Sequence, residues 1–254
     1  MSARVGWIGE ARIGEARIGE DQLPLLCFPH AGGGGVEYRH WARSLPGRVA
    51  VWPVALPGRE ARLGEPAIRR VGVLIDAMVE ALADHLDRPY ALFGHSMGAV
   101  LAFEFARGMR RIGAREPVLL AVSGRRAPTL AESGERVVLH DRPDEDLLDH
   151  LRRLAGTPTE VLAEPALQRL ILPTLRADFE MLETWAYVPE LPLDCPIHAF
   201  AGREDPVAPT REVARWRELT LAEFELCELP GDHFFLRPQA AALLARLADA
   251  LATR

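Results

Sequence analysis

Short apolar runs alternate with longer amphipathic stretches along most of this chain. Six runs have the length and composition of buried β-strands, at residues 23–28, 48–54, 89–93, 117–123, 196–201 and 221–229. Patterns with helical periodicity lie between and after them, at about 36–45, 70–87, 97–112, 209–218 and 238–252. Because strands that alternate with helices build parallel sheets covered on both faces, the pattern predicts an α/β fold with a mostly parallel central sheet.

One interval is too long for a simple crossover between strands. About 70 residues separate the run that ends at 123 from the run that begins at 196. Two apolar helical stripes lie within it, the first formed by Leu147, Leu148, Leu151 and Leu154 and the second by Leu167, Leu170, Ile171, Leu175, Phe179 and Leu182. Pro173 is expected to kink the second helix. We expect a helical insertion at about 130–190 over the carboxyl ends of the strands, either as a moving lid or as a static extra layer.

The first 20 residues follow a different pattern. They contain the repeat IGEARIGEARIGE, whose period of five matches neither a helix nor a strand. We expect an N-terminal arm at residues 1–20, either an edge strand or a loosely ordered segment. A single domain at residues 21–254 follows, because 254 residues suffice for one large α/β domain.

Composition and charge narrow the function. The net charge of −6 argues against a nucleic-acid partner, which would require a basic face. No apolar run approaches the roughly 20 residues that a membrane helix needs, and no signal peptide is evident. Cys27, Cys195 and Cys227 stand in or beside apolar runs without metal-site spacing, which predicts buried thiols in a reducing compartment. We therefore expect a cytoplasmic protein without a membrane or nucleic-acid partner.

The segment GHSMG, at 94–98, matches the pattern of a nucleophile elbow. It follows a predicted strand that ends at Phe93 and opens an apolar helix, the context in which a tight turn exposes a serine oxygen. Ser96 is therefore the predicted nucleophile, and the backbone N–H of Met97 is expected to point into the same space. We interpret His95 as a packing residue.

A serine nucleophile needs a base, and the base needs a carboxylate that orients it. His233 lies between the last predicted strand and the last helix, and Asp205 lies in the loop after the strand at 196–201. Asp232 is the rival acid, but its side chain should diverge from that of its neighbour His233. The order Ser96, Asp205, His233 is the order of α/β-hydrolases.

The glycine-rich segment FPHAGGGG, at 28–35, could approach an anion closely. The chain has no lysine, which excludes a phosphate-binding P-loop. The spacing of Gly33, Gly35 and Tyr38 does not supply the third glycine of a dinucleotide fingerprint. The remaining interpretation is half of an oxyanion hole, in which the N–H of Ala31 pairs with that of Met97. For His30, either a structural or a substrate-facing role stays open.

These segments together resemble the type II thioesterases, the free-standing editing hydrolases of polyketide synthases and nonribosomal peptide synthetases. The resemblance runs in order over about residues 22–254, through LLCFPHAGGGG, VALPGRE, GHSMGA, VSGRRAP, LRRLAGTP, LPTLRADFEMLETW, GREDPVAP and LPGDHFFL. It implies an α/β-hydrolase fold, a triad of Ser96, Asp205 and His233, and an oxyanion hole at Ala31 and Met97. It also implies that the substrate is an acyl group in thioester linkage to the phosphopantetheine arm of an acyl or peptidyl carrier protein, with no cofactor and no metal.

The thioester substrate leads to expectations about the acyl tunnel and the docking surface, and two alternative functions stay open. An acyl tunnel would be lined by His30 and by the insertion residues Leu151, Leu175, Phe179 and Leu182. The arginines Arg125, Arg126, Arg152 and Arg153 could form a docking patch for an acidic carrier, or simply be solvated surface charges. A carboxylesterase or lipase with the same triad is the alternative enzyme, and a non-catalytic interaction module is the alternative of a different class.

Overall fold

The computed structural model describes residues 4–8, 22–130, 138–154 and 156–252. Six strands form one sheet in the order β2-β1-β3-β4-β5-β6, and every neighbouring pair is parallel. Their bounds are β1 Leu23–Phe28, β2 Val49–Pro53, β3 Ala91–His95, β4 Leu119–Ser123, β5 Ile197–Gly202 and β6 Phe224–Leu229. Each lies at a range predicted from the sequence, and the predicted α/β fold with a mostly parallel sheet is confirmed.

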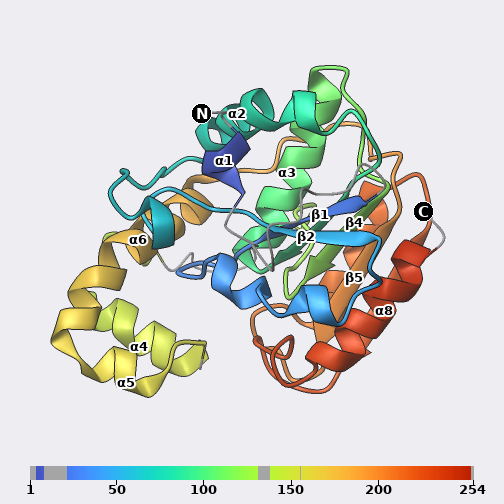
Figure 1. Ribbon diagram of the computed structural model, residues 1–254. Helices are drawn as coiled ribbons and strands as arrows, with labels where there is room; N and C mark the ends of the chain where they lie inside the picture. The colour runs from blue at the N-terminus through green and yellow to red at the C-terminus, as the bar shows by residue number, and fades with distance from the viewer. Residues whose placement is uncertain (1–3, 9–21, 131–137, 155, 253–254) are drawn as a thin grey trace.

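Helices cover both faces of this sheet (Figure 1). The α-helices of the described ranges are α1 Arg4–Trp7, α2 Val71–Leu82, α3 Met97–Arg111, α4 Asp144–Leu154, α5 Thr159–Ala163, α6 Pro165–Thr184, α7 Thr210–Val213 and α8 Ala240–Ala252. Short 3₁₀ helices are η1 Gly35–Tyr38, η2 Trp41–Arg43, η3 Glu60–Arg62, η4 Ala83–His85 and η5 Ala214–Leu219. Helices α2 and α3 lie on one face, and α8 lies on the other. None of the described helices combines the length and hydropathy that a bilayer crossing requires.

The continuous apolar character of the strands follows from this covering. Successive side chains of a strand point to opposite faces of the sheet. In β1, Leu26 and Phe28 belong to the core beneath α2 and α3, whereas Leu25 and Cys27 belong to the core beneath α8. A strand that is buried on both faces must therefore be apolar at every position.

The segment predicted as one helix at 36–45 forms the two 3₁₀ turns η1 and η2 instead. Tyr38, the last residue of η1, and Trp41, the first residue of η2, stack edge to face, and both rings contact Phe93 of β3. The Tyr38 hydroxyl also donates a hydrogen bond to the carbonyl of Phe28. Packing of these aromatic rings therefore prevails over the α-helical pattern.

The cysteines have the free thiols expected of them, but only two are buried. Cys27 and Cys195 lie in the core, and burial raises the pKa of both thiols. Cys227 is half-exposed, which corrects the prediction of three buried thiols. The reason is that β6 is an edge strand, which pairs with β5 on one side and, within the described residues, has no strand on the other.

The long interval between β4 and β5 contains α4, α5 and α6 (Figure 1). Leucines of these helices form a small core of their own, apart from the two cores of the main domain. The C-terminal half of α6 returns to the main domain, where Met181 and Leu182 join the core beneath α2 and α3. Pro173 stands within α6, which is continuous from Pro165 to Thr184. We call α4–α6 the lid helices.

The N-terminal arm is described at residues 4–8 only, and most of its repeat lies outside the described residues. Trp7 at the end of α1 is buried, and the guanidinium of Arg62 lies 4.3 Å above its ring. Its carbonyl accepts a hydrogen bond from the N–H of Ala55, and Ile8 forms an antiparallel bridge with Val54. These contacts attach the arm beside the end of β2.

Candidate active site

The segment GHSMG forms a sharp turn between β3 and α3. Ser96 has φ 54° and ψ −112°, a strained conformation that few residues other than glycine adopt. The flanking glycines are required by close packing. A Cβ on Gly94 would lie 2.0 Å from the carbonyl oxygen of Gly98, and a Cβ on Gly98 would lie 2.1 Å from that of Phe28. The turn therefore holds the serine at the carboxyl end of the sheet.

Three side chains from separate loops meet at this turn. Nε2 of His233 lies 3.0 Å from Oγ of Ser96, and Nδ1 of His233 lies 2.9 Å from Oδ2 of Asp205. A carboxylate can only accept, so Nδ1 carries the proton and donates to Asp205. Nε2 is then free to accept the proton of the serine hydroxyl. The structure thus joins the three residues that the sequence predicts as a triad.

Asp205 is held by its own loop. Its second oxygen, Oδ1, accepts hydrogen bonds from the N–H groups of Val207, at 2.8 Å, and Ala208, at 3.1 Å. Asp232, the rival acid, instead accepts from the N–H of Phe234 in a local turn. Of the two acids, Asp205 is therefore the one in contact with His233.

His95, the variable residue of the elbow, packs against His233 with 5.1 Å between ring centroids. It is fully buried, and its Nδ1 lies 3.0 Å from the hydroxyl of Ser123. Burial, together with the nearby His233, lowers the pKa of His95 well below its usual value. His95 is thus a neutral packing residue and places no second positive charge beside an imidazolium at His233.

The glycine loop turns tightly at the end of β1. The N–H of Gly33 donates to the carbonyl of His30 at 2.9 Å, and Gly32 has a φ of +74°, which favours glycine. Ala31 lies within this turn. Met97 begins α3, where the first N–H groups of a helix have no partner within it. Since β1 and β3 are neighbours that pair Phe28 with Gly94, the turn and the elbow end at the same edge of the sheet.

His30 is a buried residue with several contacts. Its Nδ1 lies 2.9 Å from the carbonyl oxygen of Ala31, its Nε2 lies 3.8 Å from a carboxylate oxygen of Glu37, and its ring stacks edge to face on Phe234. Arg237 completes this group, because its guanidinium pairs with Glu37 at 3.0 Å. His30 thus supports the glycine loop. A contact with substrate stays a prediction.

This group predicts a pH effect on stability. Burial would raise the pKa of Glu37, but His30 and Arg237 outweigh it and lower that pKa to about 2. A carboxyl whose pKa falls on folding stabilises the fold above its unfolded pKa of about 4.3, and this contribution is lost as the pH drops towards 2. We expect Glu37→Gln to lower the free energy of unfolding by about 2 kcal/mol at pH 7 and by much less at pH 2–3. Urea titrations at several pH values measure this, and an equal loss at both ends would contradict it.

The lid residues predicted to line an acyl tunnel lie in different places. Leu151 and Leu175 are buried in the core of the lid helices, and Leu175 also contacts the glycine loop at Gly32. Phe179 is half-buried and stacks on His150. Leu182 packs against the core of the main domain. The structure therefore brings Leu175 to the predicted oxyanion loop, and the role of all four towards an acyl chain stays a prediction.

The four arginines proposed as a docking patch do not form one group of unpaired charges. Arg126 lies 3.5 Å from a carboxylate oxygen of Glu212, and Arg152 pairs with Asp149 on its own helix. The docking interpretation stays a prediction.

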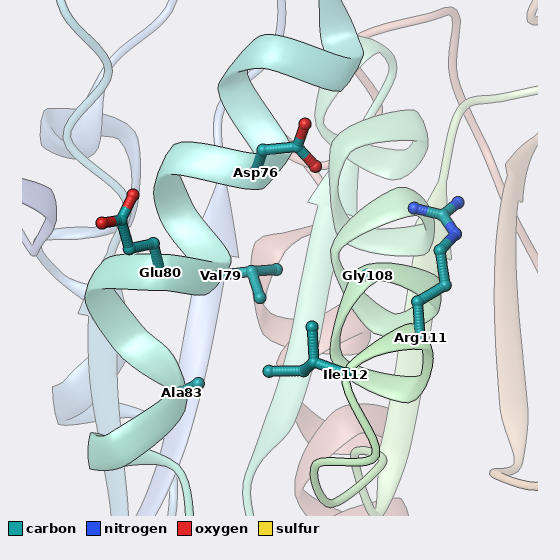
Figure 2. Close-up of a pocket in the computed structure, with 7 residues that line it drawn as sticks. All are labelled: Asp76, Val79, Glu80, Ala83, Gly108, Arg111 and Ile112. Carbon is teal, nitrogen blue, oxygen red and sulfur yellow. The ribbon is translucent and has the colours of Figure 1, made fainter.

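A surface hollow lies far from the elbow, between α2 and the C-terminal end of α3. Figure 2 shows Val79 and Ile112 facing it, with Asp76, Glu80 and Arg111 at its borders. Met97 and Arg111 lie fourteen positions apart along α3, which corresponds to about 21 Å at 1.5 Å per residue. This hollow is therefore too remote to take part in chemistry at Ser96.

Sequence reasoning missed several residues around the site. Gly156, between α4 and α5, leaves room for the ring of Phe234, since a Cβ there would lie 2.0 Å from that ring. Its carbonyl accepts a hydrogen bond from Arg237. Arg59 and Asp178 form a buried ion pair beside the glycine loop. The available signal was a charged residue within an apolar helical stripe, as Asp178 is in α6, because such a charge requires a buried partner.

The chain matches the sequence profile of the thioesterase domain over residues 23–251. It belongs to the thioesterase family. Linear gramicidin dehydrogenase LgrE of Brevibacillus parabrevis is 42% identical over 91% of this chain and 88% of its own length. RedJ, a thioesterase from the prodiginine biosynthetic pathway in Streptomyces coelicolor, superposes with a TM-score of 0.86 at 42% identity, over 92% of this chain and 87% of RedJ. YbtT, a type II thioesterase from the yersiniabactin NRPS/PKS biosynthetic pathway, superposes with a TM-score of 0.79 at 31% identity, over 93% and 95% of the two chains.

The resemblance to type II thioesterases is thereby confirmed, and so is the expectation of a thioesterase on an α/β-hydrolase fold. The serine, histidine and aspartate described above form a chain of hydrogen bonds at the elbow of this thioesterase.

Proposed function

We propose that this thioesterase removes acyl groups from the phosphopantetheine arm of acyl or peptidyl carrier proteins of polyketide or nonribosomal peptide pathways. The observation that carries the proposal is the hydrogen-bonded chain from Ser96 through His233 to Asp205, at a nucleophile elbow, in a member of the thioesterase family. The relatives named for prodiginine and yersiniabactin pathways support the choice of pathway class.

The reaction has two halves. Nε2 of His233 takes the proton of Ser96 as Oγ attacks the thioester carbonyl, and the carbonyl π electrons move to oxygen. Asp205 stabilises the imidazolium, and the N–H groups of Ala31 and Met97 stabilise the oxyanion. When the carbonyl re-forms, the C–S bond breaks, and the sulfur leaves as a thiol with the proton from His233.

The second half returns the enzyme to its starting state. Water attacks the acyl ester on Ser96 while His233 accepts one of its protons. The tetrahedral intermediate collapses, the bond between the acyl carbon and Oγ breaks, and His233 returns the proton to Oγ. The products are a free carboxylic acid and the carrier protein with a free phosphopantetheine thiol.

The name of the relative LgrE is not carried over to this chain. A nicotinamide-dependent dehydrogenase of the Rossmann type needs a dinucleotide fingerprint, and the glycine loop lacks its spacing. Tyr38 stands where the third glycine would be, and its buried hydroxyl donates a hydrogen bond to the carbonyl of Phe28. The loop is therefore closed to a pyrophosphate at that position.

The proposal predicts a preference for thioesters on carriers. We expect kcat/KM for an acyl carrier protein to exceed that for the matched oxygen ester by at least about tenfold, equal to 1.4 kcal/mol. The same acyl group on N-acetylcysteamine, a mimic of the end of the arm, should be cleaved less efficiently than on the carrier. Steady-state rates on the three substrates measure both differences. A preference for the oxygen ester would instead identify a carboxylesterase.

A further inference from the structure

Asp178 of α6 is a fully buried carboxylate that reaches the glycine loop, 146 residues away in sequence. Its Oδ2 accepts hydrogen bonds from the N–H of Gly32, at 2.7 Å, and from Nη1 of Arg59, at 2.8 Å. Its Oδ1 accepts from Nη2 of Arg59 at 2.6 Å. A buried carboxylate needs such a set of donors, because an unpaired charge in the interior is very costly.

The two side chains of this ion pair bind two successive residues of the turn, Asp178 at the N–H of Gly32 and Arg59 at the carbonyl of Gly33. Nη1 of Arg59 also donates to the carbonyl of Gly33 at 2.9 Å. The peptide that joins Ala31 to Gly32 is therefore held at both ends. His30 holds its carbonyl through Nδ1, and Asp178 holds its N–H.

The N–H of Ala31 belongs to the preceding peptide, which joins His30 to Ala31. The carbonyl of that peptide accepts the hydrogen bond from Gly33 that closes the turn. Rotation of the central peptide of a turn changes the backbone angles of the residues on both sides, here Ala31 and Gly32. Rotation by half a turn would place the carbonyl oxygen of Ala31 against the carboxylate of Asp178 and remove one of the three donors to that buried charge. Asp178 thus opposes rotation of the central peptide, and Arg59 holds the carbonyl of Gly33. Together they preserve the turn, whose closing hydrogen bond from Gly33 to His30 fixes the peptide that carries the Ala31 N–H.

We propose that Asp178 is a positioning residue for the oxyanion hole, with Arg59 as its counterion, which together hold the Ala31 N–H towards the reacting carbonyl. The inference rests on the proposed function, because it assumes acyl transfer at Ser96. The preceding turn of α6 also contacts the loop that carries Arg59. The hydroxyl of Thr174 donates to the carbonyl of Gly58 at 2.8 Å, one residue before Arg59.

The test is Asp178→Asn, which keeps the volume but removes the charge and one acceptor. Loss of an oxyanion donor lowers kcat by about 100- to 1,000-fold, so a donor that is present but loosely held should cost about 30- to 100-fold. We expect KM for an N-acetylcysteamine thioester to stay within about twofold and the pH dependence of kcat/KM to stay unchanged. An alkyl trifluoromethyl ketone, whose adduct with Ser96 carries an oxyanion, should bind more weakly by the same factor as kcat falls.

Glu180→Gln is the matched control. Glu180 lies on the same helix, two residues from Asp178, and pairs with the exposed Arg69 and Arg70. Exposed ion pairs contribute little, so this variant should keep kcat and ketone affinity within about twofold of the wild type.

A second variant separates positioning from stability. Asp178→Asn leaves Arg59 buried without its counterion, which can unfold a protein. The double variant Arg59→Met with Asp178→Leu removes both charges and replaces them with apolar side chains of similar size, a change that often preserves stability. It should fold, as circular dichroism and thermal melting would show, and should still lose kcat and ketone affinity together.

The outcomes are distinct. Wild-type kcat in a folded variant, or loss of kcat without loss of ketone affinity, overturns the inference. If neither variant folds, hydrogen exchange of the Gly32 amide in the wild type decides. Exchange only through global unfolding supports the inference, and fast local exchange overturns it. Failure of the wild type itself to hydrolyse acyl thioesters would refute the proposed function instead.

Discussion

Ser96→Ala should lower kcat for an acyl thioester by about five orders of magnitude, because it removes the atom that forms the acyl-enzyme. The residual rate would come from binding and from the oxyanion hole, which still act on direct attack by water. Single-turnover kinetics with an acyl carrier protein measure the loss, and intact-mass spectrometry detects the acyl-enzyme of the parent enzyme. The fold should persist, since alanine removes one half-buried hydroxyl.

Ser44→Ala is the matched control for this variant. Ser44 is exposed and follows η2, so its hydroxyl is not expected to affect the rate. A fluorophosphonate probe should label the parent enzyme and Ser44→Ala but not Ser96→Ala. If Ser96→Ala still released the acyl group at the parent rate, the serine mechanism would be wrong.

Asp205→Asn should lower kcat by about four orders of magnitude while the geometry of the site persists. An amide can present N–H groups to Nδ1 of His233, which favours the tautomer with the proton on Nε2. Nε2 of His233 then has no lone pair with which to take the proton of Ser96. The side-chain oxygen can still accept from Val207 and Ala208, so the loop should keep its shape.

Asp232→Asn controls for the loss of a nearby negative charge. Asparagine can accept the same hydrogen bond from the N–H of Phe234, so kcat should change by less than about threefold. Steady-state rates of the two variants, measured side by side, compare the two acids directly. A large loss in Asp232→Asn with little change in Asp205→Asn would exchange their roles.

Much of the sheet could be predicted because strand formation has a local signal. Every predicted strand boundary lies within three residues of the observed one. Runs of apolar side chains of that length, bounded by turns, can be buried only in a covered sheet. The prediction of one helix at 36–45 was wrong, because Tyr38 and Trp41 pack on Phe93 of a distant strand. This packing is made by two short 3₁₀ helices in place of one α-helix.

The predicted acyl-pocket residues show the limit of periodicity. An apolar stripe on a helix identifies the side that is buried, but not what lies opposite it. The stripe of α6 faces two different cores, with Leu175 in the lid and Leu182 in the main domain. The change occurs because α6 leaves the lid and returns to the main domain along its own length.

By itself the sequence determined the chemistry that is available and its order along the chain. It placed Ser96 in a turn from strand to helix, and Asp205 and His233 in loops after later strands, because hydrophobic period and turn chemistry act over a few neighbouring residues. Only the tertiary structure decided that Asp178 and Arg59, 119 residues apart, would hold the turn beside Ala31. A buried charge must find a partner, but the partner is selected by which segments the folded core brings together.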